Sequence, residues 1–66
     1  MRVLAGYKYK VYVGDRELKN VVQIKICDDK VLVDSEYAYK GFNCGDFIGI
    51  STIPYDKDEV TIIERG

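Results

Sequence analysis

Alternation of apolar and polar residues along the first 13 positions predicts a long β-strand. All odd positions from 3 to 13 are apolar or aromatic, whereas the even positions carry the cations Arg2, Lys8 and Lys10. Because successive side chains of a strand point to opposite faces, this pattern places one face in a core and the other in water. Gly6 lies near the middle of the strand and favours a bulge or bend there.

Four further β-rich runs follow, separated by glycine, proline and acidic residues that favour turns. Together the five predicted strands cover residues 2–13, 18–27, 31–39, 47–53 and 60–65. A chain of 66 residues is expected to form a single domain. We expect an all-β fold, in which the five strands form a small antiparallel barrel or a strongly bent sheet. Its architecture would be SH3-like or OB-like, with at most one short helical turn.

Two short turns predict how the first three strands pair. Gly14-Asp15 fits a two-residue hairpin turn, because glycine takes the positive φ needed at the first position. A four-residue loop, 14–17, would keep the same inner face and shift the partners by two. The second turn is expected at Asp28-Asp29. The predicted inner pairs are Val11 with Leu18, Tyr7 with Val22, Ala5 with Ile24, Val3 with Ile26, Ile26 with Val31, and Ile24 with Val33.

The last two runs are expected to pair with each other around residues 54–59. Pro54 lies at the predicted exit of the fourth strand, where its missing N–H removes no ladder hydrogen bond. The segment 35–40 has an alternative, a short helical turn. The apolar and aromatic residues at positions 31, 33, 37 and 39 favour a strand there instead.

The charge distribution is uneven although the net charge is only −1. The first 27 residues hold six basic and two acidic residues, whereas the rest hold four basic and nine acidic ones. Such a split is typical either of a basic binding half or of opposite charges that meet across a sheet. The predicted register places Asp34 and Glu36 on the outer face with Lys8, Lys10 and Lys25. Neutralisation within the chain is therefore favoured over a basic platform.

A cytoplasmic location is expected, because the N-terminus lacks the features of a signal peptide and no apolar run approaches the roughly 18 residues of a membrane helix. In that compartment Cys27 and Cys44 are expected to be reduced thiols that pack as small apolar groups. A single disulfide between them is the alternative.

No catalytic residue, cofactor or metal site is predicted. Histidine, the commonest general base, is absent, and two cysteines without histidine do not complete a tetrahedral zinc site. The acidic run at 56–59 has some calcium-loop character but lacks the required spacing, so a solvated turn is favoured. The glycines at 41, 45 and 49 match no phosphate-binding motif.

The aromatic residues supply the remaining candidates for contact with a partner. The sequence contains six tyrosines and two phenylalanines. Tyr7 and Tyr9 are assigned to the core, whereas Tyr12 lies on the outer face with Lys8 and Lys10. A second candidate is the aromatic loop from Tyr37 to Cys44, because connections often carry function. Its alternative role is to close one end of the barrel.

These features predict a non-enzymatic protein-binding module, for example an inhibitor or accessory protein of the type that phages direct against host machinery. Tyrosine is enriched at interface hot spots, and the near-neutral charge suits a protein partner. The predicted partner-binding residues are Lys8, Lys10, Tyr12, Lys25, Tyr37, Tyr39, Lys40 and Phe42. A homodimer is also compatible with these features.

The alternative function is the binding of single-stranded nucleic acid. Aromatic residues interleaved with lysines form stacking platforms on small barrels, and here the platform would consist of Lys8, Lys10, Tyr12 and Lys25. The sequence pI of about 5.2 opposes this function, since contacts with phosphates supply most of the non-specific affinity. No membrane partner is expected.

Overall fold

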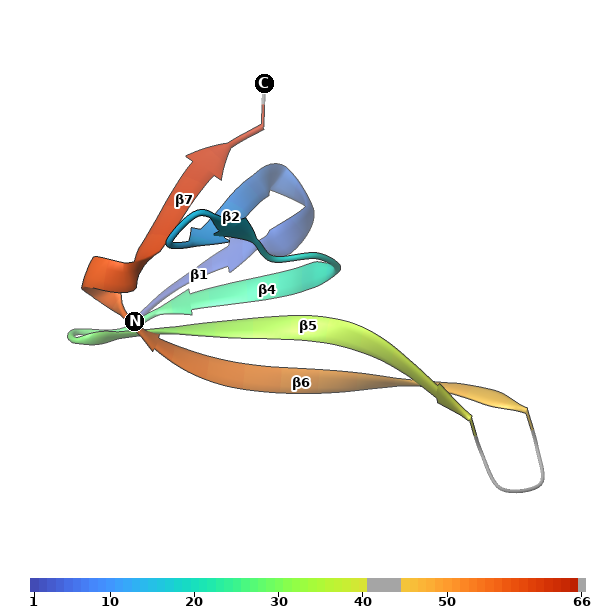
Figure 1. The fold of residues 1–66 in the computed structure, drawn as a ribbon. Coiled ribbons are helices and arrows are strands. Elements are labelled where there is room, and N and C mark those ends of the chain that lie inside the picture. Colours follow the sequence, from blue (N-terminus) through green and yellow to red (C-terminus); the bar gives the residue numbers. More distant parts are fainter. Residues whose placement is uncertain (41–44, 66) are drawn as a thin grey trace.

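The computed structural model describes residues 1–40 and 45–65, and within them seven strands form two antiparallel sheets. One sheet has the order β1-β4-β5-β6 and the other the order β3-β2-β7 (Figure 1). The strands are β1 (Arg2–Ala5), β2 (Tyr9–Val13), β3 (Arg16–Glu17), β4 (Val21–Ile26), β5 (Lys30–Lys40), β6 (Asp46–Asp56) and β7 (Val60–Glu64). The all-β class is confirmed. The predicted closed five-stranded barrel is not confirmed, because the strands form two separate sheets.

The predicted first strand is divided at Gly6, which confirms the bend expected there. A 3-10 turn, η1 (Gly6–Lys8), separates β1 from β2, and the two strands belong to different sheets. Gly6 is buried, and a Cβ at this position would lie 2.6 Å from the backbone carbonyl carbons of both Val21 and Val22. A β-bulge interrupts the β4–β5 register between Val21 and Gln23. Glycine therefore lets the chain cross closely over this irregular start of β4.

The bend changes which residues of the first strand face the core. In β1, Leu4 lies opposite Ile24, so the predicted pairs of Ala5 with Ile24 and Val3 with Ile26 are wrong. The assignment of Tyr7 to the core is also wrong, since Tyr7 lies on η1 and is 74% exposed. The three residues of η1 break the period of two, and this is why the alternation seen in the sequence does not keep one face across Gly6.

The two short turns agree with the prediction. Val13 lies opposite Arg16, which confirms the two-residue turn, and Gly14 has a φ of 64°. The Leu18 N–H donates to the Val11 carbonyl at 2.8 Å, as expected for paired residues. Across the second turn, Ile26 lies opposite Val31 and Ile24 opposite Val33, again as predicted. Beyond the bulge Val22 is exposed, so its predicted inner position is wrong.

The final strands pair differently from the prediction. β6 runs beside β5 over its whole length, and the 3-10 turn η2 (Lys57–Glu59) then carries the chain to the other sheet, where β7 pairs with β2. The predicted hairpin between the last two runs is therefore wrong. The segment 35–40 is a strand, as favoured, rather than a helical turn. Alternation predicts the faces of these strands but does not specify their partners.

The core is small and lies between the two sheets at one end of β5. Val11 of one sheet packs with Ile24, Val31 and Val33 of the other, and all four are buried. Partly buried apolar residues surround them: Leu4, Tyr9, Leu18, Val21, Ile26, Tyr55, Val60 and Ile62. Burial of these side chains is the main favourable contribution to folding.

The β5–β6 hairpin extends well beyond this core (Figure 1). We call the described part that projects, residues 35–40 of β5 and 46–51 of β6, the arm. The molecule measures 42 × 26 × 21 Å along its principal axes. The arm accounts for the long dimension, and the remaining strands form the body.

We predict that Gly6→Ala destabilises the fold. Where a helix or strand tolerates it, replacing glycine with alanine stabilises a protein by about 0.4–1 kcal/mol. Here the new methyl group would meet backbone atoms of β4, so we expect a loss of about 1–3 kcal/mol, typical of overpacking. Urea denaturation followed by circular dichroism measures it. Lys8→Ala, in the same turn but exposed, is the control. Equal stability of Gly6→Ala and wild type would contradict the close approach.

Candidate protein-docking surfaces

One face of the arm carries exposed tyrosines. Tyr37 and Tyr39 follow Val31 and Val33 at alternate positions of β5, but beyond the core they are 49% and 48% exposed. Tyr37 lies opposite Gly49, and a Cβ at position 49 would lie 2.6 Å from its Cζ atom. The Tyr37 ring therefore covers the space over the glycine. Its centroid is 5.6 Å from that of Tyr39, so the two rings form one aromatic surface.

The other face of the arm is aliphatic. Ala38 lies opposite Ile48, and Glu36 lies opposite Ile50. The two isoleucines are 73% and 55% exposed. Neither isoleucine was predicted as a contact residue, because the alternation pattern assigned their strand to a barrel wall. A signal was present, since apolar residues occupy both alternating sets of positions in the run 47–53.

A buried carboxylate fixes the place where the arm leaves the body. Asp34 is 7% exposed and accepts a hydrogen bond from Thr52 Oγ1 at 2.6 Å. Lys25 Nζ lies 3.6 Å from its other oxygen, Oδ2. The predicted proximity of Lys25 and Asp34 is confirmed. This carboxylate links β4, β5 and β6. It also forms an ion pair with Lys25, which was predicted to contact a partner.

A second ion pair closes the body end of the same hairpin. Lys30 and Asp56 lie opposite each other and form a hydrogen-bonded salt bridge on the surface. The hydrogen bond, and then the charge of the partner, raise the pKa of Lys30 and lower the pKa of Asp56. The stability that ionised Asp56 contributes to the fold is therefore lost as the pH falls through its lowered pKa. The stability that charged Lys30 contributes is lost as the pH rises through its raised pKa. Because both groups are exposed, solvent weakens the pair.

The structure distributes four of the predicted contact residues, Lys8, Lys10, Tyr12 and Lys25, over three elements. Lys10 and Tyr12 lie on β2, on the face opposite the buried Val11. Lys8 lies on η1, whereas Lys25 lies on β4 in the other sheet. Among the described residues, only Lys25 of these three lysines makes an ion pair with an acidic side chain. The expected neutralisation of Lys8 and Lys10 by Asp34 and Glu36 is therefore wrong.

The remaining predicted residues lie at the end of the arm or beyond the described part. Tyr37 and Tyr39 lie on a strand rather than in a loop, and the backbone of Lys40 pairs with Asp46 at the end of β5. Phe42 and Cys44 lie outside the described residues. Cys27 is a half-buried free thiol next to the turn between β4 and β5.

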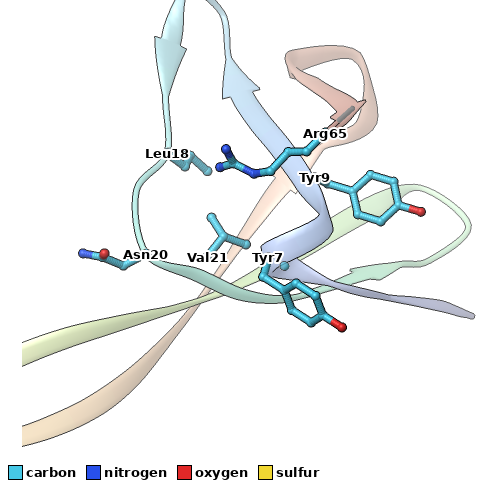
Figure 2. A pocket seen from close by; sticks show the side chains of 7 residues that line it. Tyr7, Tyr9, Leu18, Asn20, Val21 and Arg65 are labelled. Carbon is cyan, nitrogen blue, oxygen red and sulfur yellow. The ribbon is translucent and has the colours of Figure 1, made fainter.

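A hollow lies on the body next to η1 (Figure 2). Its volume is about 330 Å³, and its lining consists of Gly6, Tyr7, Tyr9, Leu18, Asn20, Val21 and Arg65. The side chain of Arg65 extends between Leu18 and Tyr9 in this view, and its backbone N–H donates to the Lys8 carbonyl at 2.8 Å. This hollow was not predicted, because the alternation pattern assigned Tyr7 to the core.

Neither a metal centre nor a membrane helix is found in the part of the chain that the structure describes. Residues 1–40 and 45–65 contain no group of three or more Cys, Asp or Glu side chains placed to hold a metal ion. None of their elements is a helix with the length and hydropathy needed to cross a membrane.

The chain matches no protein family, and no curated protein or solved structure is significantly similar to it.

We predict that Thr52→Val destabilises the protein by about 1–3 kcal/mol, because it leaves one oxygen of the buried Asp34 without its donor. The midpoint of urea unfolding measures this change. Thr61→Val makes the same substitution at an exposed position of β7 and should stay within about 0.5 kcal/mol of wild type. An equal effect of the two substitutions would show that the Thr52 hydroxyl does not support Asp34.

Proposed function

We propose that this chain is a non-enzymatic protein-binding module that docks through the arm. The observation that carries the proposal is the exposure of large apolar side chains on both faces of a projecting hairpin: Tyr37 and Tyr39 on one face, Ile48 and Ile50 on the other. An inhibitor or accessory protein is the kind of molecule in which such a module would act alone.

The small size of the chain makes this exposure informative. A domain of this length needs its large apolar residues for the core, and yet these four lie outside it. Burial of apolar surface on binding contributes a favourable free energy of about 25 cal/mol per Å². A groove that received the arm would bury side chains from both faces at once, whereas a flat sheet offers only one. Tyrosine is also among the residues enriched at binding hot spots.

Single-stranded nucleic-acid binding has less support. Its platform would require Lys8, Lys10, Tyr12 and Lys25 on one surface, and these residues lie on η1 and on strands of two different sheets. The SH3-like or OB-like architecture also remains a proposal, and it would carry no function of its own.

The test uses the full chain as bait in a lysate of the source cell, with two lysine variants. Ala38→Lys places a charge in the middle of the aliphatic face of the arm, on β5. Thr61→Lys places the same charge on an exposed position of β7 and is the control. We expect wild type and Thr61→Lys to capture one protein in stoichiometric amount. Calorimetry with that purified protein should give at least tenfold weaker binding for Ala38→Lys.

Equal affinity of the two variants would contradict docking through the arm, and capture of no stoichiometric protein would contradict the binding function. Fluorescence anisotropy with labelled single-stranded DNA at low salt tests the alternative. Binding below about 100 µM, the range of basic non-specific binders, would favour the nucleic-acid function instead.

A further inference from the structure

The outer edge of β6 carries backbone groups that point away from the sheet. In an antiparallel pair, the N–H and C=O of alternate residues point toward the same neighbour. The Cys27 N–H donates to Lys30 O, and the Glu36 N–H donates to Asn20 O, each at 2.9 Å. Even-numbered residues of β5 therefore direct these groups toward the β4 side, and odd-numbered residues direct them toward β6.

The register extends this alternation to β6. Odd-numbered residues of β5 lie opposite odd-numbered residues of β6, such as Tyr37 opposite Gly49. The backbone N–H and C=O groups of the odd-numbered residues of β6 therefore form hydrogen bonds with β5. The even residues of β6 point outward, where no strand of residues 1–40 or 45–65 continues the sheet. Pro54 is one of them, and its missing N–H falls on the outer edge. Between Asp46 and Pro54, the outward backbone donors are those of Ile48, Ile50 and Thr52.

The middle of this edge lacks the protection that the other sheet edges have, because the charges and the proline of β6 lie at or near its ends, at Asp46, Pro54 and Asp56. β1, β3 and β7 are only 4, 2 and 5 residues long, and each contains at least one charged residue. β6 has 11 residues, its run 47–53 contains no charge and no proline, and its register with β5 is unbroken. Long, regular and uncharged edges act as templates on which another strand pairs.

We infer that β6 pairs antiparallel with β6 of a second copy of this chain, about a twofold axis at Ile50. This register pairs the three outward donors among themselves: Ile50 lies opposite its equivalent, and Ile48 lies opposite Thr52. Each opposed pair exchanges two hydrogen bonds. A shift by two residues toward the body would place Ile48 opposite Pro54, which has no N–H to donate.

The shape and charge of the molecule fit this pairing. The arm projects from the body, so an antiparallel partner carries its own body at the opposite end of the paired strands (Figure 1). No like charges meet along 47–53, and the exposed Ile50 side chains become direct neighbours on one face. The two four-stranded sheets then form one continuous sheet. The pairing uses the edge of β6 and does not depend on docking through the faces of the arm.

Sedimentation velocity across a concentration series of the full chain tests the dimer. Wild type should pass from monomer to dimer as concentration rises, and Ile50→Lys should weaken association at least tenfold because it places two ammonium groups side by side at the axis. Ala38→Lys adds the same charge to the same face, one strand away from the edge, and should dimerise like wild type. Circular dichroism checks that both variants fold.

Cross-linking tests the register in a variant that carries Cys27→Ser and Cys44→Ser. Ile50→Cys should form a disulfide-linked dimer under mild oxidation, because opposed hydrogen-bonded residues have Cα atoms about 5.5 Å apart. Ile48→Cys is the matched control on the same face. In this register the two copies of position 48 in the dimer would be offset by four residues along the strands. A strand rises roughly 3.3 Å per residue, so the offset is about 13 Å and Ile48→Cys should not cross-link.

A monomer at every concentration would overturn the inference, as would a dimer that Ile50→Lys leaves intact or preferential cross-linking of Ile48→Cys. Failure of the proposed docking function gives a different result. Ala38→Lys is expected to lose the captured protein and to keep the dimer, so each idea fails in its own experiment.

Discussion

The close approach of Gly6 to the backbone of Val21 and Val22 is the constraint on which the rest of the structure depends. It allows the first part of the chain to leave one sheet and enter the other within three residues. A single unbroken strand would keep β1 and β2 in one sheet, and Val11 would then have no sheet to face. The bend places Val11 against Ile24, and this contact joins the two sheets through a shared core.

The size of that core explains the arm. The second sheet covers only the part of β5 that carries Val31 and Val33, so the alternating face of β5 continues past the core as Tyr37 and Tyr39. Two local features support the arm at its base and along its length, the buried Asp34 with its Thr52 donor and the Tyr37 ring over Gly49. The same extension that leaves apolar faces uncovered also leaves the long edge of β6 without a neighbouring strand from the described part of the chain.

Local sequence signals predicted the local features of the fold. The turns at Gly14 and Asp28, and the pairing of Ile24 with Val33, follow from turn chemistry and alternation, and the structure has them. Alternation did not reveal that η1 reverses the faces at Gly6, because the 3-10 turn depends on a contact with β4 that is distant in sequence. It also did not reveal where the core ends, since Tyr37 and Val33 follow the same pattern. The partner of β6 was missed for the related reason that a period of two specifies a face and not a neighbour.

Residue-specific amide hydrogen exchange, measured by NMR in dilute solution, tests whether β6 is bonded to β5 on one side and open on the other. We expect slow exchange at Gly49 and Ser51, whose N–H groups point toward β5, and fast exchange at Ile50 and Thr52, whose N–H groups point outward. Fast exchange at Gly49 would show that the arm is not paired. Exchange at Ile50 as slow as at Gly49, in a sample shown to be monomeric, would show instead that the outer edge of β6 is covered by its own chain.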